Sequence, residues 1–274
     1  MNDIGRFWQD GYVSPAGSVD ISAVLHEFDN QKKKETEKAR ESSTSFGRFP
    51  YFSKDMNPHL RSQEVIRLVN EAKITNSVKE ILGDDIVCIN TIFIAKSPQS
   101  GDYLAPHQDS TYWGLKTNQA VSVWIAITDS HVGNGCMSVL PGSHLQTKKH
   151  RSKDDPKNIL QMGESCEHEI NQSEMIPLEL MAGEYSIHHC QVVHMSSCNQ
   201  SKSWRVGLVL RYAHRDALDE EYLDKHIYTD LIQLAGMEGG NGCKATLPLE
   251  KDRLLFNRRY FRKLNDSALK YDSQ

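Results

Sequence analysis

The chain has 274 residues, of which 38% are hydrophobic and 25% charged, and its formal net charge is −4. This composition is typical of a globular protein, and a chain of this length can bury about three quarters of its unfolded surface in one core. The negative charge argues against a nucleic-acid surface, and the lack of a long apolar run argues against a membrane span. The six cysteines include no Cys-x-x-Cys pair and are predicted to be reduced.

These properties favour a protein that acts on a small molecule. The first residues lack the apolar core of a signal peptide, so we expect a cytoplasmic location with no nucleic-acid or membrane partner. The sequence leaves the oligomeric state open. We predict a single domain, 1–274, with its core at 86–212. A helical support and flap at 1–85 would precede the core, and a helical or lid extension at 213–274 would follow it.

The N-terminal region is predicted to be mostly helical. Phe7, Trp8 and Tyr12 are early apolar anchors of this region. The stretch 31–45 has almost no apolar residue to bury, so both a mobile flap and a rigid helix fit its composition. A better amphipathic helix follows Pro58, and a second candidate precedes the core.

From residue 86 onward the hydrophobic pattern changes from helical to extended. Short segments rich in β-branched residues and bounded by turn residues are typical of strands. About eight such segments occur, at 86–95, near His107, at 120–127, at 136–140, near 176–178, at 185–187, at 192–195 and at 204–211. Eight antiparallel strands are typical of a jelly roll. The sequence therefore predicts a mainly β fold with flanking α-helices, built on a double-stranded β-helix (jelly roll, cupin-like) core.

A His-x-Asp triplet in the predicted core is the first sign of chemistry. Side chains on a strand alternate between its faces, so His107 and Asp109 are expected to point one way and Gln108 the other. They could share one metal ion, with His194 from a later strand as third ligand. Two imidazoles and one carboxylate on one face of a ferrous ion leave three positions open for an oxo-acid and dioxygen. The pattern predicts an iron(II) site.

Two residues near the third ligand fit a co-substrate clamp. Ser196 should face the same way as His194, and antiparallel pairing about the turn at 199–202 is expected to bring it opposite Arg205. The planar fork of an arginine matches a carboxylate. A dicarboxylate held at Arg205 could place its other end on the metal, and 2-oxoglutarate has that shape.

Each of these residues also has an ordinary structural explanation. His194 fits a satisfied core histidine, Arg205 a surface ion pair and Asp109 a turn cap, so only their combination favours the iron site. The spacing Cys190-x3-His194-x3-Cys198 fits part of a zinc site. The competing functions are therefore a non-catalytic or differently metallated cupin-type binding protein and a zinc hydrolase.

Four segments occur in an order typical of one enzyme family. They are the run from His107 to Gly114, the strand at 123–129, the segment 134–144 ending in Pro-Gly-Ser-His, and the run from His194 to Asn199 with Arg205 beyond it. With these motifs the chain resembles the phytanoyl-CoA dioxygenase family over about residues 86–212, and 7–12 is similar to that family's usual start. The resemblance implies a double-stranded β-helix that uses iron(II), 2-oxoglutarate and dioxygen.

The resemblance also implies roles for individual residues. In that family the residues matching His107, Asp109 and His194 bind iron. Those matching Arg205 and Ser196 bind the distal carboxylate of 2-oxoglutarate.

Further positions are implied around this centre. The residue matching Trp124 lies near the co-substrate, and Asn90 corresponds less directly to a polar position at its other end. Thr111, Tyr112 and Trp113 follow the metal motif and are expected in the wall of the substrate pocket, although core packing explains the two aromatic residues equally well.

The implied reaction is an oxidation coupled to conversion of 2-oxoglutarate into succinate and CO2. Halogenating relatives replace the carboxylate ligand by a small residue, whereas Asp109 is retained, so hydroxylation of an unactivated C–H bond or a related oxidation is favoured. No basic cluster for nucleotide phosphates stands near the motifs, which favours a small polar metabolite or biosynthetic intermediate over a CoA ester. Specificity is expected in the loops 31–45, 145–175 and 214–245.

Overall fold

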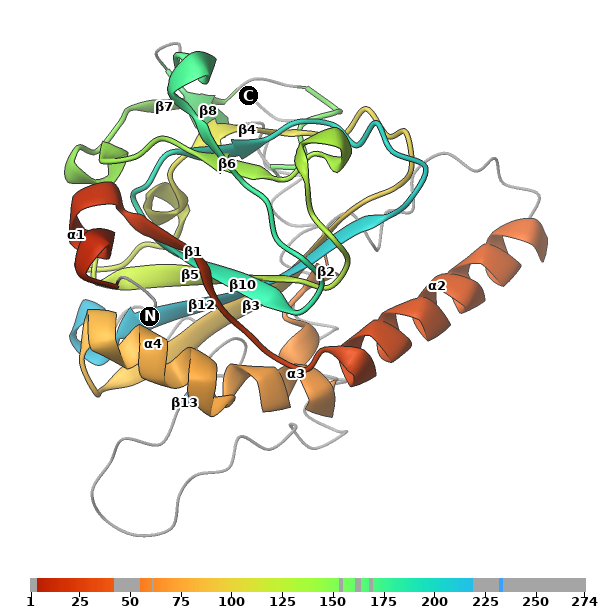
Figure 1. Cartoon of the computed structure of the whole chain (residues 1–274), viewed down its shortest axis with the longest axis horizontal. Helices are drawn as coiled ribbons and strands as arrows, with labels where there is room; N and C mark the ends of the chain where they lie inside the picture. Colours follow the sequence, from red (N-terminus) through yellow and green to blue (C-terminus); the bar gives the residue numbers. More distant parts are fainter. Residues whose placement is uncertain are drawn as a thin grey trace, which may run out of the picture.

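The computed structural model describes residues 4–41, 55–60, 62–152, 155–160, 164–167, 170–218 and 232–233. Two antiparallel β-sheets face each other, and helices cover the outer face of the larger sheet (Figure 1). This architecture confirms the predicted jelly roll with flanking helices.

The larger sheet is built on four long strands in the order β10-β5-β12-β3. Their bounds are Glu184–His189 (β10), Ala120–Ala126 (β5), Arg205–His214 (β12) and Ile86–Lys96 (β3). Three more strands join it: β1 (Tyr12–Ser18) beside β10, and β2 (Asp55–Met56) and β13 (Ile232–Gln233), which both pair with β3. All of these pairings are antiparallel.

The smaller sheet has four short strands in the order β4-β11-β6-β9. Their bounds are Leu104–His107 (β4), His194–Ser196 (β11), Met137–Val139 (β6) and Ile176–Leu178 (β9). With the four long strands they make up the eight strands expected from the sequence. The chain changes sheet at every step from β3 to β12 except between β6 and β9, which is the connectivity of a jelly roll. A separate hairpin of β7 (His150–Ser152) and β8 (Glu164–Cys166) lies in the polar excursion after β6.

The N-terminal region, predicted to be mostly helical, also contains two strands, β1 and the two-residue β2. A short helix α1 (Phe7–Asp10) ends at Gly11, whose φ of 84° is left-handed, and β1 follows where helix was expected. The mostly helical region predicted from the sequence thus also contains this strand. A sheet edge offers unpaired N–H and C=O groups along β10, and pairing with them satisfies the backbone of β1.

The later N-terminal helices agree with the prediction. α2 (Ser22–Glu41) shows that the polar stretch is helical up to residue 41, while the rest of the predicted flap lies outside the described residues. α3 (Gln63–Val69) and α4 (Ala72–Leu82) follow. No helix within the described ranges is both long and apolar enough to cross a bilayer.

The C-terminal prediction is tested at its start and at residues 232–233, which form the strand β13 where helical segments were expected. β12 runs two residues beyond the expected end of the core, to His214, and residues 215–217 form a single 3-10 turn. Residues 219–231 and 234–274, where helical segments were expected, lie outside the described residues.

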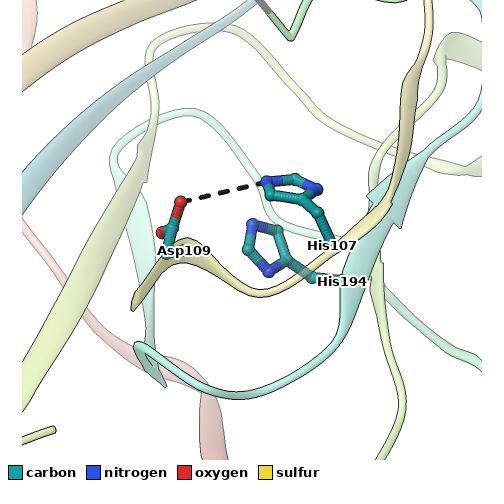
Figure 2. A group of neighbouring side chains, drawn as sticks. All are labelled: His107, Asp109 and His194. Carbon is teal, nitrogen blue, oxygen red and sulfur yellow. Dashed lines mark ion pairs between the residues drawn. The ribbon is translucent and has the colours of Figure 1, made fainter. Parts of the chain in front are cut away.

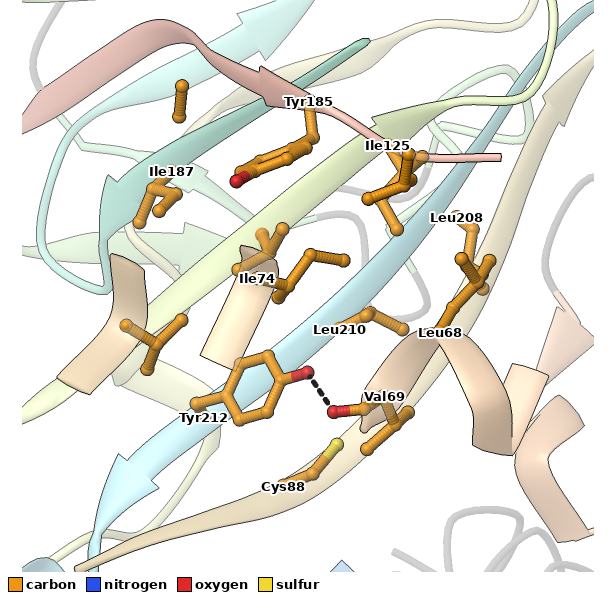
Figure 3. Packing of buried hydrophobic residues seen from close by; sticks show 14 of the residues in the cluster. Leu68, Val69, Ile74, Cys88, Ile125, Tyr185, Ile187, Leu208, Leu210 and Tyr212 are labelled. Carbon is orange, nitrogen blue, oxygen red and sulfur yellow. Dashed lines mark hydrogen bonds between the residues drawn. The ribbon is translucent and has the colours of Figure 1, made fainter. Parts of the chain in front are cut away.

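The outer face of the larger sheet packs against α3 and α4. Every second residue of β12 contributes to this core, namely Val206, Leu208, Leu210 and Tyr212. The Tyr212 hydroxyl donates a hydrogen bond of 2.9 Å to the Val69 carbonyl at the end of α3 (Figure 3). Because side chains alternate along a strand, the residues between them must face the smaller sheet.

The inner face of the larger sheet lines the space between the two sheets. Part of this space is an apolar cluster that joins Trp124 and Val209 of the larger sheet to Met137 and Val139 of the smaller one. The remaining inner positions are unusually polar for a core. They are Asn90, Lys96, Ser122, Ser186, His188, Arg205 and Arg211. Buried polar groups are unfavourable without partners, so this face marks the candidate site.

Candidate metal centre

The three predicted metal ligands converge between the sheets (Figure 2). His107 ends β4 and His194 begins β11, and the two residues are direct partners in the antiparallel register. Their ring centroids are 4.1 Å apart, and His107 Nε2 lies 3.8 Å from Asp109 Oδ1. The ligand atoms of all three residues lie within 4.8 Å of one another. All three side chains are buried, so the group is formed without competing solvent contacts.

Asp109 reaches the centre by a route that differs from the prediction. β4 ends at His107, and Asp109 begins a 3-10 helix, η3 (Asp109–Tyr112), so the two ligands do not share a strand. The intervening Gln108 does point away. Its amide donates to the carbonyls of Gln146 at 2.9 Å and Gln191 at 2.5 Å, which fixes the chain between the two ligands.

Both imidazoles are held in the orientation that a metal ligand requires. His107 Nδ1 donates to the Ala105 carbonyl at 2.8 Å, and His194 Nδ1 donates to the Val192 carbonyl at 3.1 Å. With the proton on Nδ1, the Nε2 lone pair of each ring is free to coordinate. Burial lowers the pKa of both histidines, most strongly that of His194, which favours the neutral form that binds metals.

The Asp109 carboxylate is held by residues that the sequence reasoning missed. Ser122 donates to Oδ2 at 2.9 Å, and Arg211 Nη2 donates to Oδ1 at 3.0 Å. His188 Nε2 lies 3.8 Å from Oδ2, too far for a hydrogen bond. Burial alone would raise the pKa of Asp109, but Arg211 and the nearby histidines hold that pKa well below its usual range. The carboxylate is therefore ionised and ready to ligate a cation.

These three residues gave only a weak signal in the sequence. Ser122, His188 and Arg211 are polar residues within strands that are otherwise apolar, and each occupies an inner-face position by the period of two. That pattern could have placed them on the inner face. It could not have shown that all three meet at one carboxylate.

Arg205 is buried deep in the same space. It is 2% exposed, and burial lowers its pKa to about 10, so it remains charged at neutral pH. Its Nη2 donates to Ser196 Oγ at 3.4 Å, and its Cζ lies 5.6 Å from the Trp124 ring centroid. No carboxylate within the described ranges forms an ion pair with it. A buried cation without an anion is unfavourable, so this pocket fits an anionic ligand.

The predicted pairing of Ser196 with Arg205 was wrong, although the two residues do meet. β11 pairs with β4 and β6, whereas β12 pairs with β3 and β5, so the strands are in different sheets. Ser196 reaches Arg205 because the two sheets face each other.

Lys96 is a buried lysine beside Arg205 that sequence reasoning missed. It is the register partner of Arg205, and its Nζ donates to Ser196 Oγ at 2.7 Å, to the Ser196 carbonyl at 3.1 Å and to the Ser197 carbonyl. Burial and the neighbouring Arg205 lower the pKa of Lys96 to about 6. The lysine thus holds the end of β11 next to the arginine.

Two of the remaining predicted residues, Asn90 and Trp113, contact Arg211. Asn90 donates to Asn57 Oδ1 at 2.6 Å and accepts from Arg211 Nη1 at 3.4 Å. Trp113 is buried, and Arg211 Cζ lies 5.0 Å from its ring centroid.

Thr111 and Tyr112, the other residues predicted in the wall of the substrate pocket, give little information about that pocket. Thr111 is exposed, with its Oγ1 3.2 Å from His150 Nδ1. Tyr112 ends η3, and its side chain lies outside the described part of the structure.

The donor set fits iron(II) better than structural zinc. Two histidines and one carboxylate leave coordination positions open, whereas a structural zinc site closes four ligands around the ion. Cys190 Sγ is directed to the Asn118 carbonyl at 3.3 Å, and burial raises its pKa to about 12. Among the described residues, His107, Asp109 and His194 form the one group suited to a metal ion. The Cys-His-Cys interpretation therefore has no support.

A family model that matches most of the chain identifies its family. The model for phytanoyl-CoA dioxygenase (PhyH) matches residues 7–207. The chain belongs to the phytanoyl-CoA dioxygenase family. This membership confirms the resemblance seen in the motifs. The matched range includes β1, seven strands of the jelly roll and the first residues of the eighth, β12.

Curated relatives in the family share part of the chain. The phytanoyl-CoA dioxygenase domain-containing protein 1 of Danio rerio is 28% identical over 142 residues, covering 51% of this chain and 49% of that protein. A probable alpha-ketoglutarate-dependent hypophosphite dioxygenase of Stutzerimonas stutzeri is 30% identical over 171 residues, covering 59% and 57%. The chain spans about half the length of the curated relatives it matches.

Solved structures agree on the fold. The apo form of ThoJ, a non-heme monooxygenase, has a TM-score of 0.60 and 29% identity, covering 77% of this chain and 76% of that one. SnoN, a non-heme alpha ketoglutarate dependent epimerase, has a TM-score of 0.57 and 20% identity, covering 88% and 92%. At that identity the second likeness concerns the fold alone.

Proposed function

We propose that this protein is an iron(II)- and 2-oxoglutarate-dependent dioxygenase. The observation that carries the proposal is the buried group of His107, Asp109 and His194, with the unpaired Arg205 in the same space between the sheets. A facial group of two imidazoles and one carboxylate leaves room for a bidentate oxo-acid and dioxygen. Membership of the phytanoyl-CoA dioxygenase family supports the same activity.

In this proposal His107, Asp109 and His194 bind the iron. Arg205 and Ser196 bind the distal carboxylate of 2-oxoglutarate, and the Trp124 ring limits the pocket on one side of the guanidinium. We assign these roles to the chain's single domain, 1–274, whose core contains all six residues.

The protein's own contribution is geometry and exclusion of water. Bound iron would supply the oxidising chemistry, with 2-oxoglutarate and dioxygen consumed and succinate and CO2 released. Ser122 and Arg211 fix the carboxylate ligand, while the Ala105 and Val192 carbonyls fix the two imidazoles. Such outer partners orient the ligands before the metal arrives.

We propose hydroxylation or a related oxidation of an unactivated C–H bond of a small metabolite, with no nucleic-acid or membrane partner. The retained Asp109 supports hydroxylation over halogenation. The relative from Stutzerimonas stutzeri is named for hypophosphite, a small anion, so small organic anions with a C–H bond are the first substrates to try.

The proposal is tested by measuring succinate formed from 2-oxoglutarate by the purified protein. Release of succinate should require both ferrous iron and dioxygen, and it should occur slowly even without a second substrate. His107→Ala should abolish it, and His26→Ala, which removes an exposed imidazole of α2, should not. A protein that bound no iron and never consumed 2-oxoglutarate would instead be a cupin-type binding protein. Hydrolysis of a substrate in the absence of dioxygen, with no succinate formed, would indicate a zinc hydrolase.

A further inference from the structure

The charges on the inner face are unbalanced. Among the described residues Asp109 is the one buried acidic side chain, while Arg205 and Arg211 both face the same space from β12. In the structure as it stands, Arg211 is neutralised by Asp109, at 3.0 Å.

Proposed metal binding changes that balance. Asp109 would then be shared with a divalent cation, so it would no longer neutralise Arg211 fully. 2-Oxoglutarate brings two carboxylates, of which one belongs to Arg205 and the other to the metal in the proposed function. Arg211 would be left as a largely buried cation, its side chain only 18% exposed, without a counter-ion of its own.

The immediate surroundings of Arg211 are rich in donors. Its Nε is buried without a hydrogen-bond partner in the described structure, and so is Nε1 of Trp113, against which the guanidinium packs at 5.0 Å. Both are N–H groups that can only donate. Asn90 accepts from Arg211 Nη1 at 3.4 Å and so limits the movement of the guanidinium from the other side. In the described structure, the Arg211 Nε and Trp113 Nε1 groups both lack a hydrogen-bond acceptor.

The position of Arg211 separates it from the clamp at Arg205. The two residues are six positions apart on the same face of β12, and a strand rises about 3.3 Å per residue, so their Cα atoms lie roughly 20 Å apart along it. Arg205 packs against Trp124, and Arg211 packs against Trp113 beside Asp109. Each arginine thus has its own aromatic neighbour and its own place along β12.

We propose that Arg211, with Trp113 and Asn90, forms an oxyanion subsite that holds a carboxylate, phosphate or phosphonate group of the substrate beside the metal. This inference rests on the proposed function and adds the class of substrate. A planar guanidinium braced against an indole binds such groups with two parallel hydrogen bonds.

The subsite is tested in protein that holds ferrous iron and 2-oxoglutarate under anaerobic conditions. Acetate, inorganic phosphate and methylphosphonate are titrated in turn, with neutral acetamide as the uncharged match for acetate. Binding is followed by the visible charge-transfer absorption of the iron–2-oxoglutarate complex, so no turnover is needed. The variants are Arg211→Gln, Arg211→Lys and Trp113→Phe. Arg67→Gln, which removes a half-buried arginine of α3, controls for net charge.

At least one of the three oxyanions should bind to the wild type, and acetamide should not. Arg211→Gln should weaken that binding by at least about tenfold, as expected for loss of a charge-assisted pair. Trp113→Phe, which keeps the ring and removes its N–H, should weaken it less, and Arg67→Gln should leave it unchanged. Comparison of acetate with the two phosphorus oxyanions assigns the group that the subsite prefers.

Three results would overturn the subsite. They are equal oxyanion affinity in wild type and Arg211→Gln, equal affinity for acetamide and acetate, and a complete lack of oxyanion binding by the wild type. If Arg211→Gln weakened 2-oxoglutarate binding instead, the arginine would bind the co-substrate, which also overturns the proposed subsite.

Should Arg211→Gln fail to fold, the same comparison is made with Arg211→Lys, which keeps the charge but loses the planar guanidinium. If the wild type formed no iron–2-oxoglutarate complex, the proposed function itself would fail.

Discussion

His107 and His194 are direct partners across the β4-β11 pair, with their ring centroids 4.1 Å apart. Residues opposite each other in an antiparallel pair have Cβ atoms about 5 Å apart, so two imidazoles at such positions can reach one ion. The backbone carbonyls of Ala105 and Val192 orient the two rings in addition. The metal site is therefore preorganised by the register of the smaller sheet.

Loss of any one ligand should abolish metal binding at this site. His107→Ala, Asp109→Ala and His194→Ala should each weaken ferrous or cobalt ion binding by more than about 100-fold, because even outer partners of ligands contribute about 10- to 100-fold. Titration calorimetry under anaerobic conditions measures the affinity, and His26→Ala serves as the control. Normal affinity in one of the three variants would remove that residue from the ligand set.

Replacement of Arg205 should weaken binding of the co-substrate without changing the affinity for the metal. Arg205→Ala removes a charge-assisted interaction of about 1.5–3 kcal/mol, so the Kd for 2-oxoglutarate should rise about 10- to 150-fold. Arg205→Lys should recover part of the loss because the charge remains. Calorimetric titration of the metal-loaded protein gives both values. An unchanged Kd in Arg205→Ala would assign the carboxylate to another residue.

Ser122 should support the metal through Asp109. Its hydroxyl donates to Oδ2 at 2.9 Å, and Ser122→Ala should lower metal affinity by about tenfold or more. Ser186→Ala is a matched control, since Ser186 is also buried on the inner face, on the neighbouring β10, but its Oγ has no partner in the described structure. Equal metal affinity in both variants would show that the Ser122 hydroxyl does not tune the ligand.

Gly207 should be intolerant of a side chain because Trp124 lies directly over it. A Cβ at this position would be 2.2 Å from the Trp124 ring. Gly207→Ala should displace the indole from Arg205, weaken 2-oxoglutarate binding and lower the free energy of unfolding by about 1–3 kcal/mol. Gly101→Ala is the control, because its Cβ would meet only the flexible Lys157 side chain at 3.6 Å. Unchanged co-substrate affinity in Gly207→Ala would contradict a role for the indole.

Lys96 should make the stability of the protein depend on pH. Its pKa is about 6 in the folded protein and 10.5 as the ordinary value, so between these limits the unfolded chain binds more protons. The free energy of unfolding should therefore rise with pH over this window, by at most about 1.4 kcal/mol per pH unit from this group.

Lys96→Met removes the titrating group, although it also removes three hydrogen bonds. The informative quantity is therefore the slope of unfolding free energy against pH between 7 and 9, measured by urea denaturation. The slope should be shallower in the variant than in the wild type. Parallel curves would show that the acceptor oxygens around Lys96 keep its pKa near the ordinary value.

Local sequence features were sufficient to predict the strands of the jelly-roll core. The eight strands of the jelly roll were all recognisable, because alternation and β-branched residues are properties of each segment by itself, whereas the β7–β8 hairpin was not expected. The strand at 12–18 was missed because it forms only by pairing with the edge of β10, which no local pattern reveals. Asp109 was placed on a strand for a similar reason, since the change from β4 to η3 depends on the contacts of Gln108.

For the site, the sequence by itself determined which side chains carry the chemistry. His107, Asp109, His194 and Arg205 are chemically distinctive and occur within ordered motifs, and the structure brings them into one buried space.

Only the tertiary structure decided which residues surround them. Lys96, Ser122 and Arg211 looked like scattered polar residues in strands, and Ser196 was expected at Arg205 through a hairpin that does not form. Their contacts depend on the register between strands and on how the two sheets face each other. Those relationships arise from packing between distant segments, whereas a period of two fixes only the face on which a residue lies.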